Sequence, residues 1–268
     1  MIIAGCQHDI VRCVEASGGK TLKISIITAV YNGAASIAAT LQSVAQQDHK
    51  EIEHILVDGG STDSTVDVIH EHDGRVARLI SEPDAGAYDA FNKGLRCATG
   101  DAIAFLNCGD TYTSASVVSR MAGILSLDRI DAAFADVLIV DSHDRRRIIR
   151  RYSSKRFCPG RMVYGLMPAH PSLFLRREVY ERVGEYNSNF RIAGDFELCL
   201  RVFLTPSIRY RYLNEAIVNM PTGGLSNRGW RSTLAITREM GKACTMNNVK
   251  TSFAKLCLRL PLKVLQLI

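Results

Sequence analysis

The stretch Lys23-Ile24-Ser25-Ile26-Ile27-Thr28-Ala29-Val30 decides the fold, because it is the first strongly patterned segment of the chain. Its apolar and β-branched residues predict a buried strand. The turn residues Tyr31-Asn32-Gly33 follow it directly. After the turn, Ser36 is placed to cap a helix whose apolar residues recur at helical spacing, namely Ile37, Leu41, Val44 and Ala45. The segment therefore predicts a strand, a tight turn and a helix in succession.

The same alternation continues along the chain. Further strands are predicted at residues 52–57, 78–80 and 102–106, and further helices around 66–69 and at 88–97. Strands that alternate with helices indicate a mostly parallel sheet covered by helices on both faces. After Asp110 the alternation loosens, and we expect a helix at 117–125, a strand at 132–140, a strand at 171–176 and a helix at 195–204. The predicted fold class is thus α/β.

Composition agrees with a folded domain of ordinary type. The 268 residues are 47% hydrophobic and 22% charged, which excludes disorder as the main state. This length predicts one large domain, or one domain with an appendage. Eight cysteines occur without a C-x-x-C pair or zinc-ligand spacing, so we expect scattered reduced thiols in a cytosolic protein. The net charge of +6 fits an anionic ligand or a membrane surface.

Residues 1–22 lack periodicity, and we interpret them as a loose leader. The triplet Ala4-Gly5-Cys6 resembles a lipoprotein cleavage box, but no charged and apolar signal region precedes it. The chain also lacks an apolar run of about 18 residues, so no transmembrane helix is expected.

Polar residues gather where the predicted parallel strands end. Thr28, Tyr31 and Asn32 end the first strand, the run 58–63 ends the second, and the run 107–110 ends the fourth. In open α/β sheets, ligands bind outside this edge. Acids clustered there repel one another unless a cation or a hydrogen-bonding ligand lies among them. Neither the dinucleotide-binding nor the P-loop glycine motif is present.

Four blocks of residues carry a resemblance to a known family. They are Ile26 to Asn32, Leu56 to Thr65, Ser81 to Gly94, and Ala98 to Asp101 followed by Phe105 to Asp110. In order and spacing they resemble the family 2 glycosyltransferases, over residues 23–225. The resemblance implies a GT-A fold, with a nucleotide-binding part at about 23–112 and an acceptor part at about 113–225. A helical extension would follow at 226–268.

The resemblance also implies roles for individual residues. Asp58 would hydrogen-bond the nucleotide base, which is usually uracil in the family. The residues implied in nucleotide and donor binding are Thr28, Val30, Asn32, Asp58, Gly60, Ser61, Asp84, Gly86, Asn92 and Asn107. Capping of the next helix is the alternative role for Asp58 and Asp63.

Asp110 would be the metal ligand of the family's acidic motif. That motif is often Asp-x-Asp, whereas this chain has Asn107-Cys108-Gly109-Asp110 and keeps only the final acid. One carboxylate together with phosphate oxygens and waters is a normal ligand set for Mg²⁺ or Mn²⁺. The expected cofactor is therefore a divalent cation.

On the acceptor side, Asp195 stands where the family places its catalytic base, with Gly194 before it instead of the usual Glu. A single base opposite the leaving group suffices for one inverting displacement. Glu197 lies two residues on and should face away on a helix. A helix N-cap is the alternative for Asp195. His170 is expected to contact the acceptor or a phosphate, with simple packing as the alternative.

The positive charge lies outside this acidic site. Asp144 is followed by five arginines within 145–151, which form either a solvated hairpin or a contact to phosphate or lipid. The tail places Phe253, Leu256, Cys257, Leu260, Val264, Leu267 and Ile268 on one helical face. Lys255, Arg259 and Lys263 flank that face, and Pro261 would interrupt it. Such a segment either packs on protein or lies on a membrane.

The sequence thus predicts an inverting glycosyltransferase that uses a nucleotide sugar, with UDP favoured. The expected acceptor is a hydroxyl of a glycan or a lipid-linked oligosaccharide in cell-surface polysaccharide biosynthesis, and nucleic acid is not an expected partner. The expected location is cytoplasmic, with a peripheral contact at the inner membrane as an extension of that hypothesis. The alternatives are a sugar-nucleotide nucleotidyltransferase and a non-catalytic nucleotide-sugar-binding subunit.

Overall fold

A computed structural model of the chain describes residues 21–72, 74–127, 130–223 and 230–260. The predicted leader at 1–22 therefore lies almost entirely outside the described residues, as do Pro261 and the last part of the predicted tail. Within the described ranges, no helix has both the length and the hydrophobicity that crossing a membrane requires.

The first half of the chain forms the parallel part of the sheet. Strands β1 (Ile24–Val30), β2 (Ile52–Asp58), β3 (Val76–Ser81) and β4 (Ala102–Phe105) pair in parallel in the order β3-β2-β1-β4. Helices α1 (Ala34–Ala45), α2 (Thr65–Glu71) and α3 (Ala87–Cys97) connect them. The alternation predicted from the sequence is confirmed in this half.

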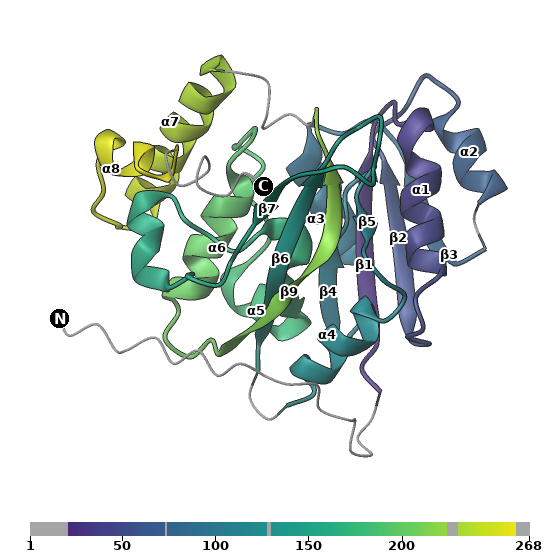
Figure 1. Cartoon of the computed structure of the whole chain (residues 1–268), viewed down its shortest axis with the longest axis horizontal. Coiled ribbons are helices and arrows are strands. Elements are labelled where there is room, and N and C mark those ends of the chain that lie inside the picture. Colours follow the sequence, from purple (N-terminus) through teal and green to yellow (C-terminus); the bar gives the residue numbers. More distant parts are fainter. Residues whose placement is uncertain (1–20, 73, 128–129, 224–229, 261–268) are drawn as a thin grey trace.

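Helices cover both faces of these strands (Figure 1). On one face, Ile37 and Leu41 of α1 pack with Val30, Leu56 and Ile69. On the other face, Phe91 and Leu95 of α3 belong to the same core cluster as Ile27 and Val57. The strands carry near-continuous apolar runs because both of their faces are buried.

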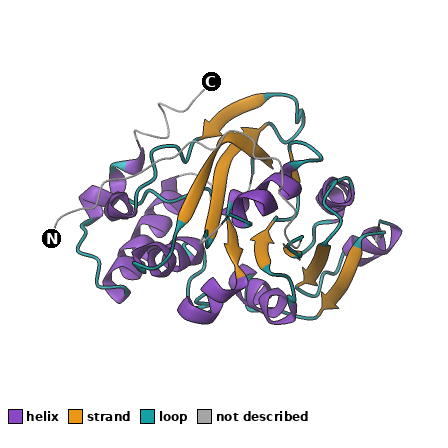
Figure 2. Ribbon diagram, turned by 90° about the horizontal axis from the view of Figure 1, so that it is seen from below, coloured by secondary structure: helices purple, strands orange, loops and turns teal. Residues whose placement is uncertain are grey.

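The second half continues the same sheet in a different pairing pattern. Strand β8 (Phe174–Arg176) pairs antiparallel with both β4 and β6 (Ala132–Val140). Strand β9 (Tyr210–Pro221) pairs in parallel with β6 and antiparallel with β5 (Thr111–Tyr112), and β7 (Ile148–Tyr152) pairs antiparallel with β6. Within the described residues, parallel pairing is thus confined to β1–β4 and to the β6–β9 pair. Figure 2 shows the resulting twisted sheet between helices.

The second half also supplies α4 (Val117–Leu125), α5 (Arg177–Val183) and α6 (Gly194–Leu204), with the short 3₁₀ helices η1 (Pro159–Tyr164) and η2 (His170–Ser172). Helices α7 (Trp230–Met246) and α8 (Phe253–Cys257) follow β9. They lie at the end of the molecule opposite α1 and α2, and α7 packs against α6 (Figure 1).

Ser36 does not cap α1, so that prediction was wrong. The helix begins at Ala34, with Gly33 at the N-cap position, and no side chain of the helix caps it. The backbone N–H of Gly33 donates instead to the Thr65 hydroxyl at 2.8 Å, and that of Ala34 donates to Asp63 at 3.3 Å. The loop after β2 thus provides the cap, which a local pattern cannot show.

The described part of the tail does not form the single amphipathic face that the sequence predicts. Leu256 is 1% exposed, whereas Phe253 is 51% exposed. Arg259 is 4% exposed instead of solvated, and its guanidinium donates to the Thr237 hydroxyl at 2.9 Å and to the Leu256 carbonyl at 2.7 Å. Residues 253–260 therefore pack on α7 and η1, in agreement with the alternative of a tail packed on protein.

Candidate functional site

The carboxyl ends of β1 and β2 form one hydrogen-bonded edge. The buried Asp58 carboxylate accepts from the Ser61 hydroxyl at 2.5 Å, from the Ser61 backbone N–H at 3.1 Å and from the Ser81 hydroxyl at 2.7 Å. The Ser61 hydroxyl in turn accepts from the backbone N–H of Asn32 at 2.7 Å. The structure therefore brings Asn32, Asp58 and Ser61 together, as the sequence predicts. Their contacts to a nucleotide stay a prediction.

Glycines bring a third loop against this edge. Gly60 has a φ of +79°, and a Cβ placed on it would lie 3.3 Å from the Pro83 backbone nitrogen. A Cβ on Gly59 would come within 2.9 Å of the Asp84 carboxyl carbon. Asp84 also accepts from the backbone N–H of Gly86 at 2.9 Å, at the start of α3. Asp84 and Gly86 thus lie beside the loop that follows β2.

Three residues predicted for donor binding, Thr28, Val30 and Asn92, are buried in the protein. The buried Thr28 hydroxyl donates to the Leu106 carbonyl at 2.7 Å and lies 3.0 Å from His54 Nε2. Val30 is part of the core. The Asn92 amide is 5% exposed, donates to the Tyr186 carbonyl at 2.8 Å and accepts from its N–H at 2.9 Å. The contacts that the structure shows for these three residues are with the protein itself.

Asp110 follows β4 at the same end of the sheet. Its side chain is buried and accepts a 3.3 Å hydrogen bond from the Asn107 amide. Burial raises the pKa of Asp110 to about 7, because the charged form loses its hydration. Burial likewise raises the pKa of the neighbouring Cys108 thiol to about 12.

The donor set at this point fits a hard cation that takes most of its ligands from the substrate. In the described part of the chain, no group of three acidic, histidine or cysteine side chains is placed to hold a metal. The carboxylate of Asp110 and the side-chain amide oxygen of Asn107 are oxygen ligands of the kind that Mg²⁺ and Mn²⁺ prefer. A cation would also offset the cost of ionising a buried carboxyl group.

Asp195 lies in the first turn of α6 and is partly buried. Its carboxylate accepts from the backbone N–H of Phe196 at 2.7 Å and from the Tyr88 hydroxyl at 3.4 Å. Ala193, rather than Asp195, occupies the N-cap position, so the structure disfavours the capping alternative. Burial raises the pKa of Asp195 to about 6. A carboxylate with a pKa near working pH is suited to accept a proton.

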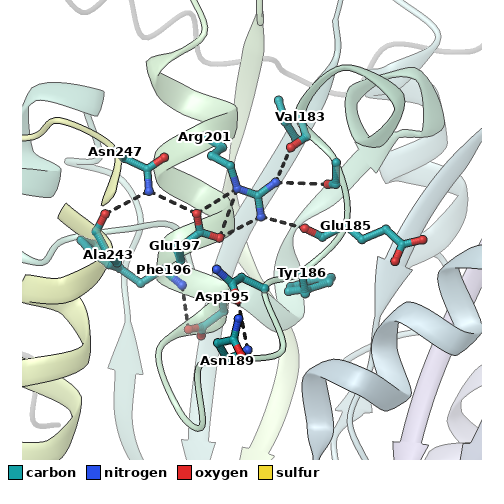
Figure 3. Close-up of polar contacts among 12 residues, drawn as sticks. Val183, Glu185, Tyr186, Asn189, Asp195, Phe196, Glu197, Arg201, Ala243 and Asn247 are labelled. Atoms are coloured by element: carbon teal, nitrogen blue, oxygen red, sulfur yellow. Dashed lines mark hydrogen bonds and ion pairs between the residues drawn. The ribbon is translucent and has the colours of Figure 1, made fainter. Parts of the chain in front are cut away.

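Glu197 faces away from Asp195 and into a separate network (Figure 3). Its buried carboxylate binds the Arg201 guanidinium at 2.8 and 2.9 Å and accepts from the Asn247 amide at 3.1 Å. Arg201 donates further to the backbone carbonyls of Val183 and Glu185. The pair therefore ties α6 to α7 and to the loop after α5.

His170 lies among aromatic rings. Its Nε2 is 2.8 Å from the Tyr186 hydroxyl, and its ring stacks on Phe91 with 5.8 Å between centroids. Burial lowers the pKa of His170 to about 4, so the ring is neutral at pH 7. These contacts favour the packing alternative, and a contact to acceptor or phosphate stays a prediction.

Tyr88 and Glu239 both contact the segment that carries Asp195, although neither is among the residues predicted for the site. The Tyr88 hydroxyl donates to the Ile192 carbonyl at 2.5 Å, and Glu239 accepts from three backbone N–H groups before α6. The sequence contains one signal that relates to Tyr88, namely Gly194 in place of the usual Glu. A Cβ on residue 194 would lie 2.7 Å from the Tyr88 ring. No local pattern points to Glu239.

Comparison with known proteins gives a consistent result. The family model described as Glycosyl transferase family 2 matches residues 25–184. A "PGL/p-HBAD biosynthesis glycosyltransferase" of Mycobacterium tuberculosis is 32% identical over 208 residues, which cover 76% of this chain and 78% of the relative. An uncharacterized glycosyltransferase of the same species is 32% identical over 186 residues, which cover 68% of this chain and 69% of the relative.

Solved structures share the fold at low sequence identity. The crystal structure of S. aureus TarS 1-349 in complex with UDP-GlcNAc has a TM-score of 0.66 and 18% identity, over 89% of this chain and 71% of that one. The mannosyltransferase PcManGT from Pyrobaculum calidifontis, in complex with GDP-Man and Mn²⁺, has a TM-score of 0.62 and 18% identity. That match covers 85% of this chain and 64% of the other. The predicted GT-A-like architecture is confirmed.

Proposed function

The chain belongs to the family 2 glycosyltransferases, and from that premise we propose that it transfers a sugar from a UDP-linked donor to a glycan hydroxyl with inversion. Membership in a glycosyltransferase family argues against both alternatives, the sugar-nucleotide nucleotidyltransferase and the non-catalytic binding subunit. The proposal rests on one observation: the carboxyl group of Asp195 is partly buried, and its pKa is raised to about 6.

In the proposed reaction, Asp195 takes the proton of the acceptor hydroxyl. The acceptor oxygen then forms a bond to C1 of the donor sugar, while the bond from C1 to the nucleoside diphosphate breaks. One displacement of this kind inverts the anomeric centre and needs no second nucleophilic carboxylate. A raised pKa suits the role, because the base is ionised at neutral pH and still basic enough to hold the proton.

Asp110 and Asn107 would hold a divalent cation, which supplies Lewis-acid stabilisation to the diphosphate leaving group when it is bound. The edge formed by Asn32, Asp58 and Ser61 would receive the base, and Gly60 and Gly86 leave room for close approach of the ligand. Asp84 would lie against the ribose or diphosphate.

Related proteins support the choice of substrates. TarS structures contain UDP or UDP-GlcNAc, and PcManGT contains GDP-Man with Mn²⁺. One of the mycobacterial relatives is named for PGL/p-HBAD biosynthesis. We therefore favour a cell-surface glycan or a lipid-linked oligosaccharide as the acceptor, used by a cytoplasmic enzyme at the inner membrane.

The test compares two acids with an exposed control. Asp195→Asn should reduce transfer by about 10²–10⁴-fold, the usual contribution of a general base, and should leave donor binding intact. Asp110→Ala should weaken the Mn²⁺-dependent stabilisation by nucleotide sugars in a thermal-shift assay. Asp67→Asn, an exposed first-turn acid of α2, is the control and should change neither measurement. Normal turnover in Asp195→Asn would eliminate this base and the mechanism built on it.

A peripheral membrane contact is supported by two exposed apolar side chains of the extension. Phe253 and Leu258 are 51% and 53% exposed, and the exposed Lys255 lies between them in sequence. The double variant Phe253→Ser with Leu258→Ser should lose co-sedimentation with anionic vesicles and keep its transfer activity on a soluble acceptor. Equal vesicle binding by the variant and the parent would remove this contact from the proposal.

A further inference from the structure

Glu239 of α7 binds the turn that leads into α6. Its Oε1 accepts from the backbone N–H of Arg191 at 3.2 Å, and its Oε2 accepts from those of Ile192 and Ala193 at 2.9 and 2.8 Å. A single carboxylate thus receives hydrogen bonds from three consecutive residues. All three stand directly before the helix that carries Asp195.

These contacts are strong ones for physical reasons. Hydrogen bonds from N–H groups to an ionised carboxylate are shorter and stronger than neutral ones. The start of a helix also carries a partial positive charge, which favours a carboxylate nearby. Helix α6 begins at Gly194 with Ala193 at its N-cap, so the three bonded N–H groups lie just before the first helical residue. Glu239 therefore holds, from another helix, the turn that enters α6.

The same turn is also held from the other side. The Tyr88 hydroxyl of α3 donates to the Ile192 carbonyl at 2.5 Å, and it lies 3.4 Å from Asp195 Oδ1. Glu239 holds the N–H groups of this turn while Tyr88 holds one of its carbonyls. A second link connects this region to α6, where Asn247, the residue directly after α7, donates to Glu197 of α6 (Figure 3).

We propose that Glu239 is a positioning residue for Asp195: from α7 it fixes the turn at 191–193 and thereby the place of the carboxylate at the start of α6. This inference rests on the proposed role of Asp195 as the base. It makes the C-terminal extension part of the catalytic unit, in contrast to an appendage that serves only for attachment. Displacement of a catalytic group by about 1 Å can cost about 10²-fold in rate.

Charge provides a readout that a merely structural contact would not. Among residues 21–72, 74–127, 130–223 and 230–260, the titratable groups that interact with Asp195 are Tyr88, Tyr152, Tyr186, Cys199 and Glu239. The first four have pKa values raised by burial and are neutral at pH 5–9. Burial is the main cause of the raised pKa of Asp195, and the Glu239 carboxylate adds a smaller contribution in the same direction. Its removal should lower that pKa and move the acidic limb of the kcat profile toward lower pH.

The experiment measures kcat, donor KM and the pH profile for Glu239→Ala and Glu239→Gln. Glu181→Gln, an exposed acid on α5, is the control. Glu239→Ala should lose about 10²-fold in kcat with donor KM within about twofold. Glu239→Gln keeps an acceptor oxygen, so it should retain more of kcat and still show the shifted acidic limb.

The outcomes separate this inference from the proposed function. If both variants keep the kcat and the acidic limb of the control, the positioning role is overturned. A fall in kcat with an unmoved limb would also overturn it, because that result indicates general destabilisation. If Glu239→Ala does not fold, the pH profile of Glu239→Gln decides. Normal turnover in Asp195→Asn would instead refute the proposed base, whatever the Glu239 variants do.

Discussion

The edge that would bind the donor and the segment that carries Asp195 are built in different ways. At the donor edge, Asp58 bonds Ser61 three residues away, and Asp84 bonds Gly86 two residues away. On the acceptor side, Asp195 contacts Tyr88 from 107 residues away, and Glu239 binds the Ala193 N–H from 46 residues away. The donor edge therefore combines short-range bonds with contacts between neighbouring loops, as from Asn32 to Ser61 and from Ser81 to Asp58. The acceptor side depends on contacts from much farther along the chain. Substitutions should reveal this difference in stability.

The largest expected effect is on the acceptor side, at Arg201. Arg201→Met would leave the buried Glu197 carboxylate without its ion pair and the carbonyls of Val183 and Glu185 without a donor. Breaking a buried pair in this way typically costs ~3–5 kcal/mol. Urea unfolding should show a free energy of unfolding lowered by that amount.

Arg96→Met is the matched control, because Arg96 also binds Glu185, through its carboxylate at 2.6 Å. Both partners of that pair are exposed, and exposed pairs contribute ~0–1 kcal/mol. Equal losses in the two variants would show that the network around α6 gains nothing from its burial. The comparison between a packed acceptor side and a local donor edge would then lose its basis.

A second prediction concerns two buried histidines, one in each region. His54 lies in β2 beneath the donor edge, and His170 lies on the acceptor side. Burial lowers their pKa values to about 3 and about 4, from 6.5. Below pH 6.5 the unfolded chain takes up protons that the folded chain refuses, so stability falls as the pH falls. Each histidine should make the free energy of unfolding about 2 kcal/mol lower at pH 5 than at pH 7.

The measurement is the free energy of unfolding in urea at pH 7 and at pH 5. His54→Gln and His170→Gln should each make the loss between these two pH values smaller by about 2 kcal/mol. The exposed His143→Gln should behave as the parent. If one of the two buried histidines has no effect on the pH dependence, then that region is not closed to water as the structure indicates.

The fold could be predicted from the sequence wherever periodicity decides the structure. Helix α4 and strand β6 have the predicted bounds, because continuous apolar runs and helical spacing are local properties. The start of α1 and the packing of Arg259 were missed. In both cases the deciding partner, Thr65 or Thr237, lies on another element.

The site shows the same division. The sequence pattern placed Asp58 and Asp110 at the ends of the second and fourth predicted strands, where the structure has them, and the structure brings Asp58 and Asp84 to neighbouring loops of one edge. It could not show that Asn92 holds the Tyr186 backbone, or that Glu239 holds the turn before Asp195. A carboxylate on a helix far along the chain has no spacing relation to the residues that it binds, so only tertiary structure reveals it.

The smallest expected effect is at the donor edge, at Ser61. Ser61→Ala removes the hydroxyl that donates to Asp58 and accepts from Asn32. The Ser61 N–H and the Ser81 hydroxyl still donate to Asp58, so its carboxylate is not left without partners. We therefore expect a loss of about 0.5–1.5 kcal/mol, the net contribution of an ordinary hydrogen bond, in urea unfolding. Ser64→Ala is the control, since Ser64 is exposed and makes no side-chain cap on α2. A loss at Ser61 as large as that at Arg201 would mean that the donor edge also depends on a single contact, and the contrast between the two regions would disappear.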